Sequence, residues 1–133
     1  MPSRVWSHLS DYAMIDASGK ASIIGEFDLI YAATLPAQHP MLFVTSKWIG
    51  FENESFTHQV RITSPSKKEV SKGPRSTIIM QTRPGAHDSM HINFDAFLLT
   101  SFEEYGEYAI DIIVNNDVVH ILPLSIVRPI KAS

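Results

Sequence analysis

Apolar and polar residues alternate along several stretches of this chain. The period of two is clearest in three runs, at 56–64, 90–98 and 108–114. Their apolar sides are Phe56, Val60 and Ile62, then Met90, Ile92, Phe94, Ala96 and Leu98, and then Tyr108, Ile110, Ile112 and Val114. Because successive side chains of a strand point to opposite faces, this pattern predicts strands with one face on a core and the other in water.

Less regular patterns predict five further strands. These are Val5–Met14, Lys20–Tyr31, Met41–Ile49, Thr77–Gln81 and Val118–Val127. The run from Met41 is largely apolar, which indicates a strand in the middle of a sheet. Pro123 has no backbone N–H to donate, so the last strand should be an edge strand or should be bulged at that residue.

Turn residues separate these strands. Asp16-Ala17-Ser18-Gly19 has the composition of a tight turn, and the polar segment 64–74 is predicted to be a mobile loop. Gly106-Glu107-Tyr108 resembles a tyrosine corner, in which the phenol binds nearby backbone while the ring packs in the core. We therefore predict one all-β domain over residues 1–133, a two-sheet antiparallel β-sandwich of about eight strands with immunoglobulin-like architecture.

Composition narrows the classes of function. The 133 residues are 44% hydrophobic and 19% charged, as in ordinary globular domains, and the net charge of −3 gives no electrostatic basis for binding nucleic acid. The absence of cysteine excludes disulfides, thiolate nucleophiles and thiolate metal ligands. The first residues lack the apolar core of a signal peptide, and no apolar run approaches the roughly 18 residues of a membrane span. We therefore expect a cytoplasmic protein that contacts no membrane.

Three motifs near the start of the chain carry a family resemblance. They are Asp11-Tyr12-Ala13, then Asp16-Ala17-Ser18-Gly19-Lys20, and then Ile24-Gly25-Glu26-Phe27-Asp28-Leu29-Ile30. In this order they resemble the opening of a family of small uncharacterised bacterial proteins. The loop 36–40 and the closing Gly106-Glu107-Tyr108 hairpin are similar to later landmarks of that family. The resemblance implies a β-sandwich and no assigned activity, cofactor or catalytic residue.

The segment His87-Asp88-Ser89-Met90-His91 is the best candidate for metal or acid–base chemistry. Two histidines four residues apart would meet on a helix, but along a strand four residues span roughly 13 Å, which is too far for one ion unless the loop curves. His91, Asn93 and Asp95 share one face of the strand predicted at 90–98, where they could bind a ligand or orient a general base. The same stripe is also what the solvated face of an ordinary strand looks like.

Other constellations have simpler structural explanations. Carboxylates at residues 11, 16, 26 and 28 could hold calcium, but the spacing of a calcium loop is missing and Asp16 suits a turn. Trp6, Tyr12, Tyr31 and Trp48 could form a platform for sugars or bases, although aromatic residues at alternating strand positions usually belong to a core. No nucleophile turn or glycine-rich phosphate loop occurs.

Function is therefore predicted in two forms. The first is a non-enzymatic module that binds a protein or assembles with itself, as a homodimer for example, because Phe97, Leu99 and Ile113 fall on faces predicted to be wet. The alternative is a small-ligand or metal-dependent enzyme that uses a His/Asp cluster on one sheet face. The candidate ligand-binding residues are His87, His91, Asn93 and Asp95, and we expect no catalytic residue, metal or cofactor.

Overall fold

The computed structural model describes residues 2–130, and those residues form ten β-strands and no helix. No helix within 2–130 is therefore available to cross a membrane. The strands are β1 (Ser3–Ile15), β2 (Ala21–Glu26), β3 (Leu29–Tyr31), β4 (Ala37–Gly50), β5 (Ser55–Thr63), β6 (Glu69–Lys72), β7 (Ser76–Ile79), β8 (Ser89–Phe102), β9 (Gly106–Val114) and β10 (Asp117–Val127). The all-β prediction is confirmed, with ten strands in place of about eight.

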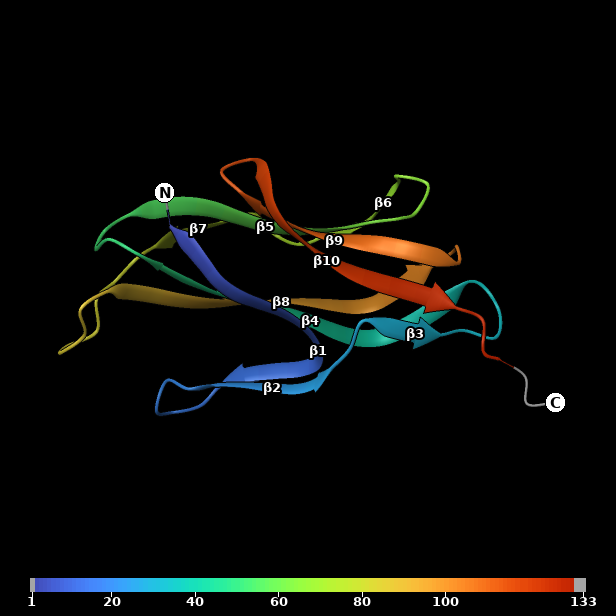
Figure 1. Ribbon diagram of the computed structural model, residues 1–133, viewed down its shortest axis with the longest axis horizontal. Coiled ribbons are helices and arrows are strands. Elements are labelled where there is room, and N and C mark those ends of the chain that lie inside the picture. The colour runs from blue at the N-terminus through green and yellow to red at the C-terminus, as the bar shows by residue number, and fades with distance from the viewer. Residues whose placement is uncertain (1, 131–133) are drawn as a thin grey trace.

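The strands form two sheets (Figure 1). The four-stranded sheet has the order β2-β1-β4-β8, and all its neighbours are antiparallel. The six-stranded sheet has the order β3-β10-β9-β5-β6, with β7 also paired to β5. Its short β3 runs parallel to β10, so the strand orientation is mixed where only antiparallel pairs were expected. Strand β4 lies between β1 and β8, which confirms the central strand predicted from Met41.

The core lies between the two sheets and takes side chains from both. Strands β5 and β9 follow the predicted alternation: their apolar side is buried. The buried apolar cluster comprises Leu9, Ala32, Leu42, Val44, Trp48, Phe56, Val60, Ile62, Ile78, Met80, Phe97, Phe102, Tyr108, Ile110, Ile112, Val114, Leu124 and Ile126. Burial of this apolar surface is the main favourable term in folding.

Tyr108 forms the predicted tyrosine corner at the start of β9. Its ring is buried and packs edge-on against Phe102, with 5.0 Å between the ring centroids. Its hydroxyl donates to the carbonyl of Glu104 at 2.9 Å and accepts from the N–H of Glu104 at 3.0 Å. The phenol thereby ties the turn before β9 to the core.

Strand β10 confirms the expectation drawn from Pro123. Strand β3 pairs only with residues Ser125–Val127 of β10, so Pro123 lies on a stretch whose other side has no neighbour in the described sheet. Because no described strand lies on that side, the missing backbone N–H of Pro123 removes no hydrogen bond to a neighbouring strand there. The register shift of β10 lies between Val118 and His120, away from the proline.

Two predicted segments are wrong in detail. The single strand expected at Lys20–Tyr31 is divided, because the chain leaves the four-stranded sheet after β2 and enters the six-stranded sheet at β3. Gly25 has a φ of +69°, a conformation that favours glycine, next to this crossing. The mobile loop expected at 64–74 contains β6, which pairs with β5, and its turn is held by the hydrogen bonds of Ser64 with Lys67 and Lys68.

Strand β8 has the expected period but the opposite orientation. Phe97, predicted to face water, is only 4% exposed, whereas Leu98, predicted to face the core, is 69% exposed. His91, Asn93 and Asp95 share the inward side with Phe97, so the polar stripe faces the interior. Leu99 is exposed as expected, and it adopts a φ of 53° within the strand. The predicted wet residue Ile113 is half-buried.

Candidate functional site

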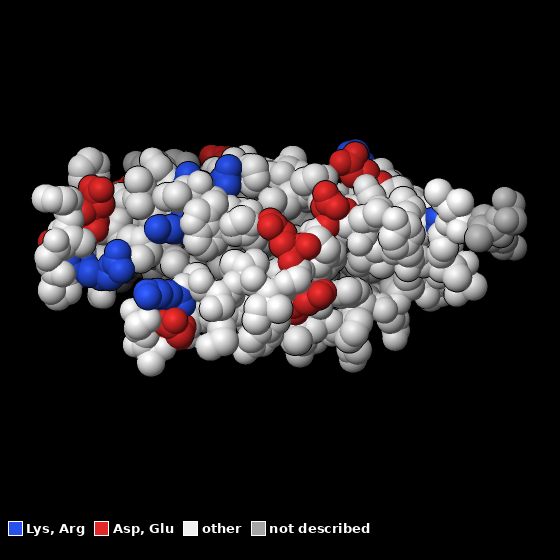
Figure 2. All heavy atoms as spheres, turned by 60° about the horizontal axis from the view of Figure 1, so that its bottom comes forward, with Lys and Arg blue, Asp and Glu red and all other residues white. Residues whose placement is uncertain are grey.

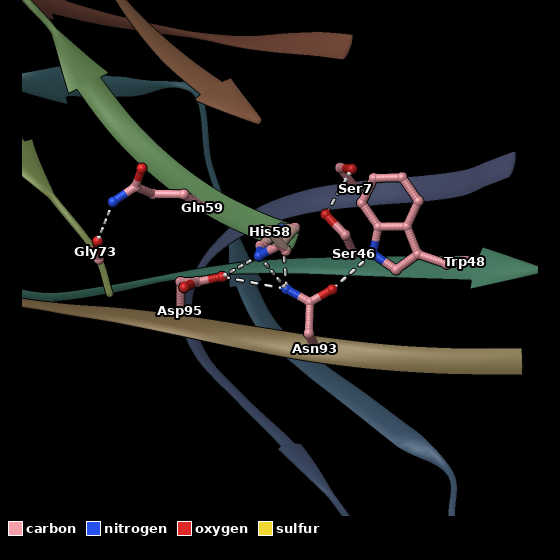
Figure 3. Close-up of polar contacts among 8 residues, drawn as sticks. All are labelled: Ser7, Ser46, Trp48, His58, Gln59, Gly73, Asn93 and Asp95. Carbon is pink, nitrogen blue, oxygen red and sulfur yellow. Dashed lines mark hydrogen bonds and ion pairs between the residues drawn. The ribbon is translucent and has the colours of Figure 1, made fainter. Parts of the chain in front are cut away.

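Asn93 and Asp95 meet a third polar side chain, His58 of β5, between the two sheets (Figure 3). The Asn93 amide nitrogen lies 3.2 Å from Oδ2 of Asp95 and 3.2 Å from Nε2 of His58. Nδ1 of His58 is 3.6 Å from the same carboxylate oxygen. A proton on Nδ1 suits both contacts, since Nε2 can then accept from the amide while Nδ1–H faces the carboxylate.

The indole of Trp48 completes this buried polar cluster. Its Nε1–H donates to Oδ1 of Asn93 at 2.7 Å, so the amide accepts on one side and donates on the other. The Trp48 ring also lies edge-on to His58, with 5.9 Å between the centroids. Three strands, β4, β5 and β8, therefore hold one hydrogen-bonded network across the core. We call Trp48, His58, Asn93 and Asp95 the buried polar cluster.

The segment between β6 and β7 covers the cluster from one side. The N–H of Gly73 donates to the carbonyl of Val60 at 2.9 Å, and its carbonyl accepts from the Gln59 side chain at 3.0 Å. A Cβ at Gly73 would lie 3.4 Å from Oδ1 of Asp95, so the backbone runs directly over the carboxylate. His58 and Asp95 are consequently 1% and 7% exposed.

Burial sets the charge state of the cluster. It lowers the pKa of His58 to about 4, with a further lowering from the nearby His91. It raises the pKa of Asp95 to about 6, against the lowering effect of the hydrogen bond from Asn93. Between pH 4 and pH 6 both groups are therefore uncharged: the imidazole of His58 is neutral, and the carboxyl of Asp95 keeps its proton. At neutral pH the carboxylate is ionised beside a neutral imidazole, so the 3.6 Å contact is a polar contact between a charged and a neutral group and not a salt bridge.

The four predicted ligand-binding residues do not come together. Asn93 and Asp95 are in the buried polar cluster, and His91 is half-buried on the same side of β8, where burial lowers its pKa. His91 also lines a surface hollow of about 290 Å³ with Gln81, Thr82 and Arg83 among its walls. His87 is exposed in the loop between β7 and β8. The hollow beside His91 is not lined by Asn93 or Asp95.

The carboxylates near the first hairpin perform separate structural tasks. Asp16 accepts from the Ser18 hydroxyl at 2.6 Å and from the N–H groups of Ser18 and Lys20 at 2.9 and 3.0 Å. These bonds, above all that from the hydroxyl, hold its pKa below the usual value. Glu26 contacts Nδ1 of His8 at 2.6 Å. No group of three or more His, Asp or Glu side chains within residues 2–130 has a geometry that could hold a metal ion.

The outer side of the four-stranded sheet is unusually apolar. The strand register places Trp6 beside Lys47, and Lys47 beside Ile92, on this face. Elsewhere on the same face it places Tyr12 beside Ile24, and Met41 beside Leu98. Tyr12 and Phe43 are also in edge-on ring contact at 5.2 Å. We call this surface the outer apolar face: Trp6, Tyr12, Ile24, Met41, Phe43, Ile49, Met90, Ile92, Phe94 and Leu98.

The outer side of the six-stranded sheet has an ion pair, between Arg61 and Asp111, as well as exposed apolar residues such as Ile121. There Asp111 of β9 accepts from Nε of Arg61 at 3.0 Å and from the Thr63 hydroxyl at 2.8 Å. On the side of the molecule that carries β2, Figure 2 shows Lys and Arg mostly toward one end, Asp and Glu mostly near the middle, and uncharged residues elsewhere. An exposed apolar surface of this kind usually marks a contact with another molecule.

Two members of the buried polar cluster, His58 and Trp48, were not predicted. His58 shares the side of β5 that carries Phe56, Val60 and Ile62, and this placement alone could have identified a buried histidine. Trp48 was assigned to a central strand, but the partner of its indole N–H depends on β8 turning its polar side inward. No local pattern in the sequence reports that orientation.

Most of the chain matches the model of a protein family. Residues 5–127 match a family of unknown function, DUF6941. The chain belongs to this family. The match spans both sheets, from β1 to the end of β10, so the matched residues of this chain include the buried polar cluster and the outer apolar face. A comparison with curated proteins finds no match.

Proposed function

We propose that this protein is a non-enzymatic module that binds a protein partner through the outer apolar face. The observation that carries the proposal is the distribution of apolar side chains on β8 and its neighbours. Ile24, Leu98 and Tyr12 are 54%, 69% and 41% exposed in one sheet face. Contiguous apolar area of this kind is rarely left uncovered in a protein that works alone.

The shape and chemistry of the surface favour a protein over a small ligand. The residues lie in register across four neighbouring strands, which makes a broad surface and not an enclosed pocket. Aromatic side chains and methionine are enriched at protein interfaces, and this face has Trp6, Tyr12, Phe43 and Met41 among its members. Its polar side chains include the contacting pair His8 and Glu26, which resembles the polar rim of such interfaces, and Lys47 between Trp6 and Ile92.

A matched pair of substitutions tests this proposal. Ile24 on the outer apolar face and Ile121 on the outer side of the six-stranded sheet have similar exposures, 54% and 51%. The chain is immobilised and exposed to extract of its native cells, and retained proteins are compared for wild type, Ile24→Lys and Ile121→Lys. We expect retention of a specific partner to be lost in Ile24→Lys and kept in Ile121→Lys.

The same experiment can refute the proposal. Equal retention by both variants would mean that the partner does not use the outer apolar face. Circular dichroism and urea unfolding of both variants serve as controls, because an exposed Ile→Lys change should alter stability little at either site.

The alternative is the small-ligand or metal-dependent enzyme predicted to use His87, His91 and Asp95, of which His91 lines the surface hollow. The half-buried His91 and its hollow are the observations in its favour. Metal analysis of purified protein, together with a His91→Ala variant, separates the two functions. A stoichiometric metal that His91→Ala loses would favour the enzyme, and the binding module predicts no change in metal content.

We also propose that the two sheets form an immunoglobulin-like sandwich. The tyrosine corner at Tyr108 and the buried Trp48 on an internal strand support this architecture. The parallel pair of β3 and β10 departs from it. Superposition on immunoglobulin-like domains of an experimental structure would test the assignment strand by strand.

A further inference from the structure

Strand β8 is a long edge of the four-stranded sheet. It has fourteen residues and pairs with β4 along its whole length, but on its other side only its first residues have partners in the described chain. Ser89 forms a bridge with Thr82, and the N–H of Met90 donates to the carbonyl of Gln81 at 3.4 Å. Beyond these contacts, the sheet order places no strand beside residues 91–98.

The bond from Met90 shows which peptide groups point toward the open side. Alternate residues of an antiparallel strand direct both N–H and C=O to the same neighbour. Since Met90 points away from β4, the peptide groups of Ile92, Phe94 and Ala96 do so as well. The open side of β8 is therefore a row of free backbone donors and acceptors, which is a template for another strand.

Other exposed edges in the described sheets are short or irregular. Strand β2 has six residues and contains Gly25 at a φ of +69°, and β6 has four residues that begin and end on charges, Glu69 and Lys72. The free part of β10 is interrupted by Pro123 and by its register shift. Such features normally prevent pairing between sheets. Residues 91–98 contain no proline, glycine or lysine, and their one charged side chain, Asp95, points into the protein's own core.

We propose that two copies of this chain pair through their β8 edges, antiparallel and about a two-fold axis, to make one continuous eight-stranded sheet. An identical strand is a suitable occupant because an antiparallel pair of identical strands is self-complementary and closed. The pairing goes beyond the proposed function: it joins the two outer apolar faces into one surface, whatever partner that surface then takes.

The side chains select the register. A two-fold axis at Asp95 would set one carboxylate opposite its copy, and like charges directly opposite each other are destabilising. An axis at Phe94 sets Phe94 beside its copy, Ile92 beside Ala96, and Asn93 beside Asp95 of the second chain. It also keeps the paired segment clear of the Thr82 bridge at one end and of the irregular Leu99 at the other.

The absence of cysteine makes this register directly testable by crosslinking. Hydrogen-bonded pairs in antiparallel sheets have Cα atoms about 5.5 Å apart, within the range of a disulfide. We expect wild type at micromolar concentration to have twice the chain mass by light scattering. Under mild oxidation, Phe94→Cys should form a covalent dimer, and Tyr12→Cys, from the middle of the outer apolar face, should not.

A second variant removes the backbone interaction itself. Ala96→Pro deletes one N–H on the open side without breaking a bond to β4, so the chain should fold and become monomeric. If Ala96→Pro does not give a native circular dichroism spectrum, Ala96→Lys places a charge on the same edge and should also give a monomer. A dimeric mass for a folded edge variant would refute edge pairing.

Two other outcomes would overturn the proposal. A wild-type protein of single-chain mass means that β8 does not pair, and leaves the proposed function to be decided by the Ile24→Lys comparison. A dimer that crosslinks through Tyr12→Cys and not through Phe94→Cys is held face to face. In that case the outer apolar face is the interface between copies, so the proposed function survives and edge pairing fails.

Discussion

Strands β9 and β8 show opposite relations between sequence pattern and burial. On β9 the apolar side, Tyr108 to Val114, is buried and the other side carries Asp111, as the alternation predicts. On β8 the apolar side from Met90 to Leu98 points outward, and the side with Asn93 and Asp95 is inside. The comparison teaches that a period of two establishes a strand with two faces, and does not by itself decide which face is buried.

The difference comes from the neighbours of each strand. Strand β9 lies between β10 and β5 in the six-stranded sheet, so its apolar side is the only one that can complete the core. Strand β8 is an edge strand whose polar side chains find partners in His58 and Trp48. A buried polar group that is hydrogen-bonded costs little, whereas an unpaired one costs about 1–3 kcal/mol. Satisfied partners thus allow β8 to bury the side that looks solvated.

Truncating one side chain on each strand gives the largest expected contrast. Tyr108→Ala removes a buried ring from the β9 side of the core and should lower the free energy of unfolding by about 3–5 kcal/mol. Leu98→Ala, on the predicted apolar side of β8, should change it by about 0.5 kcal/mol or less because that side chain is exposed. Urea unfolding measures both. Comparable losses would show that Leu98 is in a core.

The buried polar cluster should respond next most strongly. Asn93→Ala leaves the indole N–H of Trp48 without its acceptor and takes a donor from Asp95, so we expect a loss of about 2–3 kcal/mol. In a Trp48→Phe background the same change should cost less, because the indole N–H is already gone. Equal losses in both backgrounds, measured by urea unfolding, would mean that the bond from Trp48 to Asn93 contributes nothing.

A change of pH should act in opposite directions on Asp95 of β8 and on His58 of β5, its partner in the buried polar cluster. The folded pKa of Asp95, about 6, lies above the ordinary value of 3.8, so its contribution to stability is present at low pH and is lost as the pH rises through about 6. The lowered pKa of His58, about 4 against 6.5, acts in the opposite direction, and its contribution is lost as the pH falls from 6.5 toward 4. In wild type the two contributions largely offset each other.

Asp95→Asn removes only the first of these contributions. The variant should be more stable than wild type by about 1–2 kcal/mol at pH 7, and this advantage should disappear toward pH 4. Its own stability should fall steeply between pH 6.5 and 4, where His58 must be protonated on unfolding. Urea unfolding across this range tests the prediction. A constant difference between variant and wild type would show that Asp95 titrates alike in the folded and unfolded states.

The smallest expected effect is at the tyrosine corner. Tyr108→Phe keeps the ring beside Phe102 and removes only the hydroxyl that binds Glu104, so the free energy of unfolding should fall by about 1 kcal/mol. The ratio of this loss to that of Tyr108→Ala separates the hydrogen bond from the packing of the ring. A loss as large as that of Tyr108→Ala would mean that the phenol, and not the ring, holds β9 in place.

Much of this fold is determined locally and could be predicted from the sequence. The strands containing Phe56, Met41 and Tyr108, the turn at Asp16 and the tyrosine corner each depend on neighbouring residues, through alternation, turn chemistry or one short hydrogen bond. The edge position of Pro123 follows from the chemistry of a single residue. Such features need no knowledge of which strands become neighbours.

Tertiary structure alone decided the orientation of β8, the division of the strand at Lys20–Tyr31 between two sheets, and the meeting of His58 with Asn93 and Asp95. Each depends on contacts between residues far apart in the chain. His58 and Asn93 are separated by 35 positions, and neither residue signals the other. The physical reason is that strand geometry sets the spacing of side chains locally, whereas burial is a property of the whole assembly of sheets.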